Sequence, residues 1–237
     1  MIEAPKFSET LWEWRTFCKT FHKSLLNTIR VLPVKFDRPT KMTDNYVWTP
    51  NCNLNIKLRE HDLKIKQLLG SQLCRTEDTL GVSTYAELWT TEVFSFPISI
   101  FLMKRIAEGL KIDNISKISR GADDKEKFIE LLQSQSNSVK VLSISKNRQQ
   151  HLLPIDESLE FQEHKDLEKL ATTIEVSHVL SPEDVYTLSV EHPRFDMVRA
   201  AIPMLMRNVD KQVYRGMVFM NYLQVVKMWG LGKKIFD

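Results

Sequence analysis

The segment from residue 53 to residue 66 constrains the fold most, because apolar and polar side chains alternate along two short runs. The first run is NLNIKLR (53–59), the second is LKIK (63–66), and a short turn at 60–62 separates them. Side chains of a β-strand point alternately to its two faces. The segment therefore predicts a β-hairpin with one apolar face and one strongly basic face. An ordinary antiparallel sheet with a solvated outer face would show the same pattern, so the rest of the chain must distinguish the two.

The composition is that of an ordinary globular protein. The chain has 237 residues, of which 43% are hydrophobic and 27% charged, and this allows one large β-rich domain or two small ones. Its net charge of +3 is too weak to indicate duplex DNA as a partner. The longest apolar run, from residue 93 to 103, is too short to span a bilayer.

The cysteines and the first residues indicate the compartment. Cys18, Cys52 and Cys74 are odd in number and widely spaced, without a CxxC pair. This argues against a disulfide framework or a zinc site and favours a reducing compartment. The opening residues, MIEAPK, lack the apolar core of a signal peptide. We therefore expect a cytoplasmic protein with no membrane association.

Further strands and helices follow from hydrophobic periodicity. Strands are predicted over 11–17, 45–49, 87–96 and 139–149, and a second hairpin over 172–179 and 185–191. Helices are predicted over 18–32, over 98–110, around 124–132 and from 194 onward, whereas the polar stretch 70–84 is predicted to be a loop. We expect one α+β domain over residues 1–237, with a helical insertion at about 98–135 and a C-terminal helical segment from about 194.

Charged side chains occupy the polar positions of these strands, and cations outnumber carboxylates by seven to three. The set is Glu13, Arg15, Lys57, Arg59, Lys64, Lys66, Lys146, Arg148, Glu175 and Glu191. Each unpaired charge in a dry interior would cost several kcal/mol, so this face is either open to water or lines a wet cavity with a polyanionic occupant. A phosphate chain suits such a cavity, because Lys and Arg neutralise its oxygens and carboxylates hold Mg²⁺ or Mn²⁺. Metal-assisted attack of water on a phosphoryl group needs only positioning and charge stabilisation.

Several of these strands resemble motifs of a known family. The run LWEWR (11–15) is similar to the ExExK strand that names the CYTH superfamily, the triphosphate tunnel metalloenzymes. Its RxR and LTxK strands resemble KLR (57–59) and LKIK (63–66), and its later KxR strand resembles SKNR (145–148). Its glutamate-bearing C-terminal strands resemble TIEV (173–176) and LSVE (188–191). The order and spacing agree over roughly residues 9 to 200.

The resemblance implies a closed antiparallel β-barrel of about eight strands that forms a tunnel, with helices packed outside. Members of the family bind triphosphate compounds through the basic residues and a divalent metal through the glutamates. They hydrolyse thiamine triphosphate, inorganic tripolyphosphate or RNA 5′-triphosphate ends, or they cyclise ATP to cyclic AMP. The partner implied for this chain is a triphosphate-containing small molecule or an RNA 5′ end.

The family's functional residues carry over to matching positions. Glu13, Glu175 and Glu191 would be ligands of Mg²⁺ or Mn²⁺, and Glu13, Glu175 and Lys66 are the candidate catalytic residues. The phosphate ligands would be Arg15, Lys57, Arg59, Lys66, Lys146 and Arg148. Lys64 falls in the family's threonine position and shares a face with Lys66, so it joins the candidate phosphate ligands.

Two departures from the family pattern bear on activity. Leu11 stands where the first glutamate is expected, unless Glu9 reaches in from one residue pair earlier, and Lys57 lacks the bidentate fork of the arginine that it replaces. Three functions remain open: a metal-dependent triphosphate phosphohydrolase, an adenylate-class nucleotide cyclase, and a tunnel that binds nucleotide, polyphosphate or an RNA 5′ end without turnover. The loss at Leu11 favours the last, whereas the other motifs favour the first. No oligomeric state is predicted.

Overall fold

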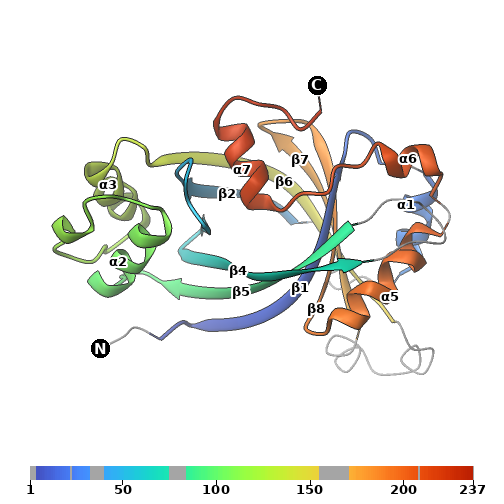
Figure 1. Cartoon of the computed structure of the whole chain (residues 1–237), viewed down its shortest axis with the longest axis horizontal. Helices are drawn as coiled ribbons and strands as arrows, with labels where there is room; N and C mark the ends of the chain where they lie inside the picture. The colour runs from blue at the N-terminus through green and yellow to red at the C-terminus, as the bar shows by residue number, and fades with distance from the viewer. Residues whose placement is uncertain are drawn as a thin grey trace.

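A closed barrel of antiparallel strands forms the centre of the molecule (Figure 1). The computed structural model describes residues 4–21, 23–32, 40–74, 84–154, 171–207 and 209–236. Within them the strands are β1 (Phe7–Cys18), β2 (Thr40–Trp48), β3 (Leu54–Arg59), β4 (Asp62–Cys74), β5 (Thr84–Ser95), β6 (Lys140–Leu153), β7 (Thr172–Ser181) and β8 (Val185–His192). Around the barrel they follow the order β1-β5-β4-β3-β2-β6-β7-β8. The predicted closed antiparallel barrel of the α+β class is confirmed.

The β3–β4 hairpin is formed as its alternation predicted. Leu58 pairs with Leu63, and Lys57 pairs with Lys64. One core cluster, which also contains residues of α2 (Ile100–Gly109) and α3 (Lys125–Gln135), buries Leu54, Ile56, Leu58, Leu63 and Ile65 of the hairpin. The opposite face, which carries the basic residues, lines the interior of the barrel.

Helices cover the barrel at two ends and along one side. Figure 1 shows α2 and α3 together at one end, and α1 (Lys23–Arg30), α5 (Phe195–Met206) and α6 (Lys211–Arg215) at the other. Helix α7 (Tyr222–Gly230) contacts β2, β3 and β6. The helices α2 and α3, with the 3₁₀ turn η1 (Ile115–Lys117), separate β5 from β6, where the helical insertion was predicted. Within the described residues, no helix combines the length and the apolar character needed to cross a membrane.

A second core cluster lies between β1, β8 and the helices α5 and α6. Trp14 is fully buried there, and its indole Nε1 donates a hydrogen bond to Thr84 Oγ1 at 3.1 Å. The tryptophan points away from the charged residues on either side of it, as strand alternation requires. The apolar face of β1 therefore anchors the strand against the helices, while the other face is left for the interior.

Several predicted boundaries are wrong, and in the three cases below the reason is that strand pairing extends beyond the local pattern. The helix predicted over 18–32 starts at Lys23, because β1 runs to Cys18, which pairs with Tyr186 of β8. The loop predicted over 70–84 is part strand, because β4 stays paired with β5 as far as Cys74. Strand β2 begins five residues before the predicted Asn45, because it pairs with β6 from Thr40 onward. Residues 75–83 of the predicted loop lie outside the described residues.

Candidate functional site

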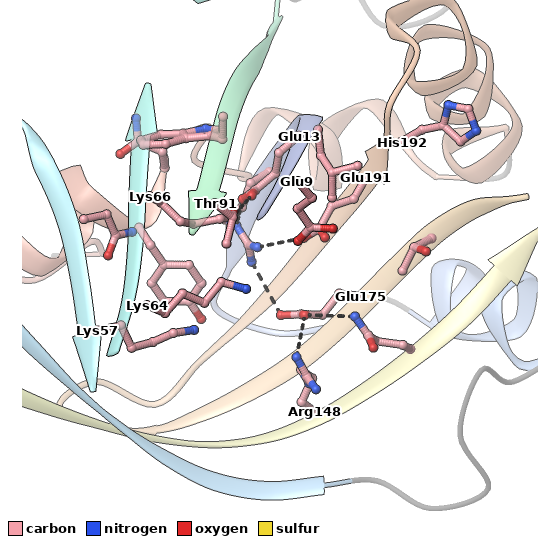
Figure 2. A pocket seen from close by; sticks show the side chains of 18 of the residues that line it. Glu9, Glu13, Lys57, Lys64, Lys66, Thr91, Arg148, Glu175, Glu191 and His192 are labelled. Atoms are coloured by element: carbon pink, nitrogen blue, oxygen red, sulfur yellow. Dashed lines mark hydrogen bonds and ion pairs between the residues drawn. The ribbon is translucent and has the colours of Figure 1, made fainter. Parts of the chain in front are cut away.

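The barrel encloses a cavity of about 440 Å³ that is lined by charged side chains (Figure 2). All ten charged strand residues of the sequence analysis line it: Glu13, Arg15, Lys57, Arg59, Lys64, Lys66, Lys146, Arg148, Glu175 and Glu191. They come from β1, β3, β4, β6, β7 and β8. The prediction that separated strands direct these groups into one shared interior is confirmed. Their individual roles stay predictions.

Alternation along β1 explains which residues reach the cavity. Glu9, Leu11, Glu13 and Arg15 all line it, at every second position of the strand. Leu11 pairs with Trp89 of β5, which also lines the cavity. Leu11, which stands at the position of the first glutamate in the family pattern, is therefore an apolar side chain in a charged wall. Glu9 supplies a carboxylate two residues earlier on the same face.

Three carboxylates converge on the guanidinium of Arg15. Its Nε donates to Glu13 Oε1 at 2.6 Å, its Nη2 lies 3.5 Å from Glu191 Oε1, and its Nη1 lies 4.0 Å from Glu175 Oε1. Glu13 and Glu191 are direct cross-strand partners on β1 and β8. Figure 2 shows Lys57 and Lys64 reaching from the β3–β4 hairpin toward Glu175 on the other side of the cavity.

The three carboxylates differ in how readily they hold a proton. Burial alone would raise the pKa of Glu13, but Arg15 and Lys66 outweigh burial and lower it to about 2. Lys66 Nζ lies 2.8 Å from Glu13 Oε2. The pKa of Glu191 is raised, because burial and the charges of Glu13 and Glu175 together exceed the effect of the nearby cations. Glu191 is therefore the carboxyl group of the three that protonates first.

Most of the remaining cations belong to two contact groups. Glu175 lies 3.7 Å from Lys146 Nζ and 3.5 Å from Arg148 Nη1. Burial would raise the pKa of Glu175, but these two cations and Arg15 outweigh burial and lower it. On the neighbouring wall, Asp44 of β2 accepts hydrogen bonds from Arg59 Nε at 2.7 Å and Nη2 at 2.9 Å. Mutual contacts therefore order the side chains of these two groups.

Sequence reasoning missed Asp44 and Tyr222. Asp44 lies one residue before the predicted start of its strand, although it alternates with Tyr46, and that alternation was the available signal. Tyr222 comes from α7, and its ring lies 4.6 Å from the guanidinium carbon of Arg15 and 4.8 Å from Lys146 Nζ. No strand pattern could have indicated a cavity residue that a helix supplies.

The three carboxylates are of the chemical type that binds a divalent metal ion. Carboxylate oxygens are ligands that Mg²⁺ and Mn²⁺ prefer, and Glu13, Glu175 and Glu191 approach one common cation, the guanidinium of Arg15. As they are placed, no group of three or more acidic, histidine or cysteine side chains within the described part of the chain is arranged to hold a metal ion. A metal ion at this position would therefore take over contacts that Arg15 makes.

Comparisons with known proteins give structural likenesses only. No family model matches the sequence, and no curated protein does. The chain is similar to a solved conserved hypothetical protein from Pyrococcus furiosus, with 16% identity, a TM-score of 0.45, and coverage of 90% of this chain and 98% of that chain. It is also similar to the PH1819 protein of Pyrococcus horikoshii OT3, with 14% identity, a TM-score of 0.38, and coverage of 91% and 97%. It is similar as well to the PH1012 protein of the same organism, with 15% identity, a TM-score of 0.42, and coverage of 82% of this chain and 88% of that chain.

Proposed function

We propose that the interior of the barrel binds the phosphate chain of a triphosphate-containing compound and that the protein hydrolyses this compound with Mg²⁺ or Mn²⁺. The observation that carries the proposal is the excess of positive charge in one enclosed space. Seven Lys and Arg side chains line the cavity against the carboxylates of Glu9, Glu13, Glu175 and Glu191, and the buried Asp44 beneath three of them still leaves the cations in excess. Such an excess is costly unless an anion shares the space, and a phosphate chain supplies oxygens that Lys and Arg neutralise.

The size of the cavity supports a small-molecule ligand. Sites for small molecules commonly have volumes of about 300–1,000 Å³, and this cavity measures about 440 Å³. Its cations are spread over β1, β3, β4 and β6, so they surround the space instead of forming one flat patch. A linear polyanion that extends through the cavity would meet cations along its length.

Each group of side chains has a role in this proposal. A divalent ion held by Glu13, Glu175 and Glu191 would polarise the terminal phosphoryl group and lower the pKa of a bound water. Lys66 keeps its proton, because the carboxylates of Glu13 and Glu191 outweigh burial and raise its pKa. Its ammonium group therefore serves as a fixed positive charge beside the reacting phosphoryl group. The other cations neutralise the remaining phosphate oxygens.

A second candidate function is binding of the same ligand without turnover. Two observations favour it: Arg15 lies among the three carboxylates that would hold the metal ion, and Leu11 stands where the family has a glutamate. Both reduce the negative charge available to a divalent ion. This candidate shares the anion site with the first and differs from it only in the chemical step.

One set of assays separates the two candidates. The protein is incubated with tripolyphosphate, thiamine triphosphate or ATP and Mg²⁺ or Mn²⁺, and phosphate, pyrophosphate and cyclic AMP are measured. We expect phosphate release that Glu175→Gln abolishes and that Glu126→Gln, at an exposed carboxylate on α3, leaves unchanged. Pyrophosphate release with a cyclic product would instead indicate a cyclase.

Thermal unfolding tests binding itself. A ligand present at 100 times its Kd stabilises the folded state by about 2.7 kcal/mol, which is a readily measured shift. Stabilisation by triphosphates without phosphate release would support the second candidate. If none of the three compounds stabilised the protein or was hydrolysed, both candidates would be wrong.

A further inference from the structure

We propose that Asp44 is a positioning residue of the anion site, which holds Arg59, Lys57 and Lys146 in place for a phosphate chain. This inference rests on the proposed function, because it assigns a role within the same site. It adds a residue that none of the sequence motifs contains. Three kinds of observation support it: the place of Asp44 in the barrel, its contacts, and the charge that it balances.

Asp44 lies on the interior side of the barrel, beneath the cations that line the cavity. Its side chain is fully buried, and it is not among the residues that line the cavity, whereas the three cations around it are. Strand β2 runs between β3 and β6, so a side chain on its inner face can reach cations of both neighbours. Asn45 pairs with Leu58, which places Asp44 beside Arg59, and Met42 pairs with Lys146.

The contact with Arg59 fixes the orientation of the guanidinium. Arg59 Nε and Nη2 donate to the two carboxylate oxygens of Asp44 at 2.7 and 2.9 Å. A bidentate pair of this kind sets geometry as well as charge. It occupies one edge of the guanidinium and leaves the Nη1 amino group outside the fork. The Arg59 side chain is 28% exposed and lines the cavity, so Asp44 orients a group that a ligand can reach.

The contacts with the two lysines balance charge. Asp44 Oδ2 lies 3.4 Å from Lys57 Nζ and 3.9 Å from Lys146 Nζ. Three cations that crowd one wall would repel one another, and each would be costly to bury alone. One buried carboxylate between them offsets part of this repulsion and still leaves the group positively charged. An incoming phosphate chain therefore meets an ordered cationic wall.

The titration behaviour of this group agrees with that role. Burial would raise the pKa of Asp44, but Lys57, Arg59 and Lys146 outweigh burial and lower it, so the carboxylate stays ionised. The pKa of Lys57 is lowered far below its ordinary value by burial and by the cations Arg59, Lys146 and Lys64, and Asp44 opposes this shift. Without Asp44, Lys57 would lose its proton more readily and its charge would not be available to an anion.

The sign of one measurement distinguishes positioning from simple charge balance. Asp44→Asn removes one negative charge, so at a pH low enough to keep Lys57 protonated the wall becomes more positive by one charge. If Asp44 were only a negative charge near the site, this change would tighten anion binding. If Asp44 positions the three cations, the change weakens anion binding although the net charge has become more favourable.

The experiment measures tripolyphosphate affinity by calorimetry with EDTA present, so that metal binding does not contribute. We expect Asp44→Asn to weaken binding at least about tenfold and Asp44→Glu, which keeps the carboxylate, to recover part of the loss. The control is Leu132→Ala on α3, a buried apolar substitution away from the cavity, which lowers thermal stability and should leave affinity unchanged. Unchanged or tighter binding by Asp44→Asn would overturn the role of Asp44 and leave the proposed function intact.

A second pair of variants answers the same question if Asp44→Asn does not fold. Lys57→Met is compared with the double variant Asp44→Asn/Lys57→Met. The double variant removes one positive and one negative charge, so fewer buried cations lack a partner than in Asp44→Asn alone. We expect the double variant to bind tripolyphosphate at least about tenfold more weakly than Lys57→Met alone. Equal or tighter binding by the double variant would overturn the proposal. If the wild-type protein bound no tripolyphosphate, ATP or thiamine triphosphate, the proposed function would fail and this inference with it.

Discussion

Arg15 Nε lies 2.6 Å from Glu13 Oε1, and the two side chains stand two residues apart on the face of β1 that lines the cavity. The same guanidinium contacts Glu191 and Glu175. Two opposite unit charges about 4 Å apart attract each other by roughly 4 kcal/mol at an effective dielectric constant of about 20. Arg15 therefore competes with any divalent ion for these three carboxylates.

The first prediction concerns this competition. Arg15→Gln removes the positive charge and leaves the carboxylates, so we expect Mn²⁺ to bind about tenfold more tightly, or better, in the absence of any phosphate ligand. Electron paramagnetic resonance of free Mn²⁺ measures this affinity directly. The control is Arg105→Gln, because Arg105 pairs with Glu92 at a partly exposed site on α2 away from the three carboxylates. Unchanged or weaker Mn²⁺ binding by Arg15→Gln would show that Arg15 does not hold the place of a metal ion.

The second prediction is loss of stability in acid through Glu13. Its pKa is about 2 in the folded protein, against an ordinary value of 4.5. A carboxyl group whose pKa is lowered by folding stabilises the protein above the unfolded pKa, and this contribution is lost as the pH falls from about 4.5 to about 2. The shift corresponds to roughly 3 kcal/mol at most.

Urea unfolding between pH 7 and pH 3 measures the contribution of Glu13. We expect Glu13→Gln to be less stable than the wild type at pH 7 and to lose less free energy of unfolding on acidification. Glu191 acts in the opposite direction, because its pKa is raised and its cost to stability therefore disappears as it protonates. Equal acid sensitivity of the wild type and Glu13→Gln would contradict the assignment.

The third prediction is that anion binding takes up a proton at Lys57. Burial and the cations Arg59, Lys146 and Lys64 lower the pKa of Lys57, with Asp44 opposing them. A phosphate chain beside it would raise this pKa again, so binding should draw in a fraction of a proton and weaken as the pH rises. Calorimetry in two buffers of different ionisation enthalpy measures the uptake.

Lys57→Arg is the control for this prediction, since an arginine stays charged throughout the accessible pH range. Titration of tripolyphosphate itself contributes equally to both proteins and cancels in the comparison. We expect the variant to take up fewer protons and its affinity to depend less on pH. The same uptake in Lys57→Arg would place the titrating group elsewhere.

Much of the site could be predicted because a closed barrel has only two surfaces. A strand whose charged residues fall at every second position must place all of them on the same surface. The alternation of Lys57 with Leu58 and of Lys64 with Leu63 was therefore enough to assign one apolar and one basic face. Burial of the leucines and the lining of the cavity by the lysines agree with it.

The parts of the fold and of the site that the sequence did not predict depend on contacts between distant segments. The alternation of Asp44 with Tyr46 could have extended the predicted strand by one residue, but the start of β2 is set by pairing with β6, where Thr40 faces Arg148. Tyr222 reaches the cavity only because α7 docks on β2, β3 and β6. Helix periodicity identifies a buried face, but it does not identify the residue that meets a cavity on another element.

The last prediction tests the anchoring of β1, on which both Glu13 and Arg15 depend. Trp14 lies between them in the sequence, is fully buried on the other face, and packs its ring 5.6 Å from that of Phe219. Trp14→Ala should lower the free energy of unfolding by about 3–5 kcal/mol, the usual cost of truncating a large buried aromatic residue. Denaturant unfolding measures it, with Phe101→Ala as the control. Phe101 is 60% exposed, so its truncation should cost less than about 0.5 kcal/mol. A cost below about 1 kcal/mol for Trp14→Ala would mean that the buried packing of Trp14 does not hold β1 in place.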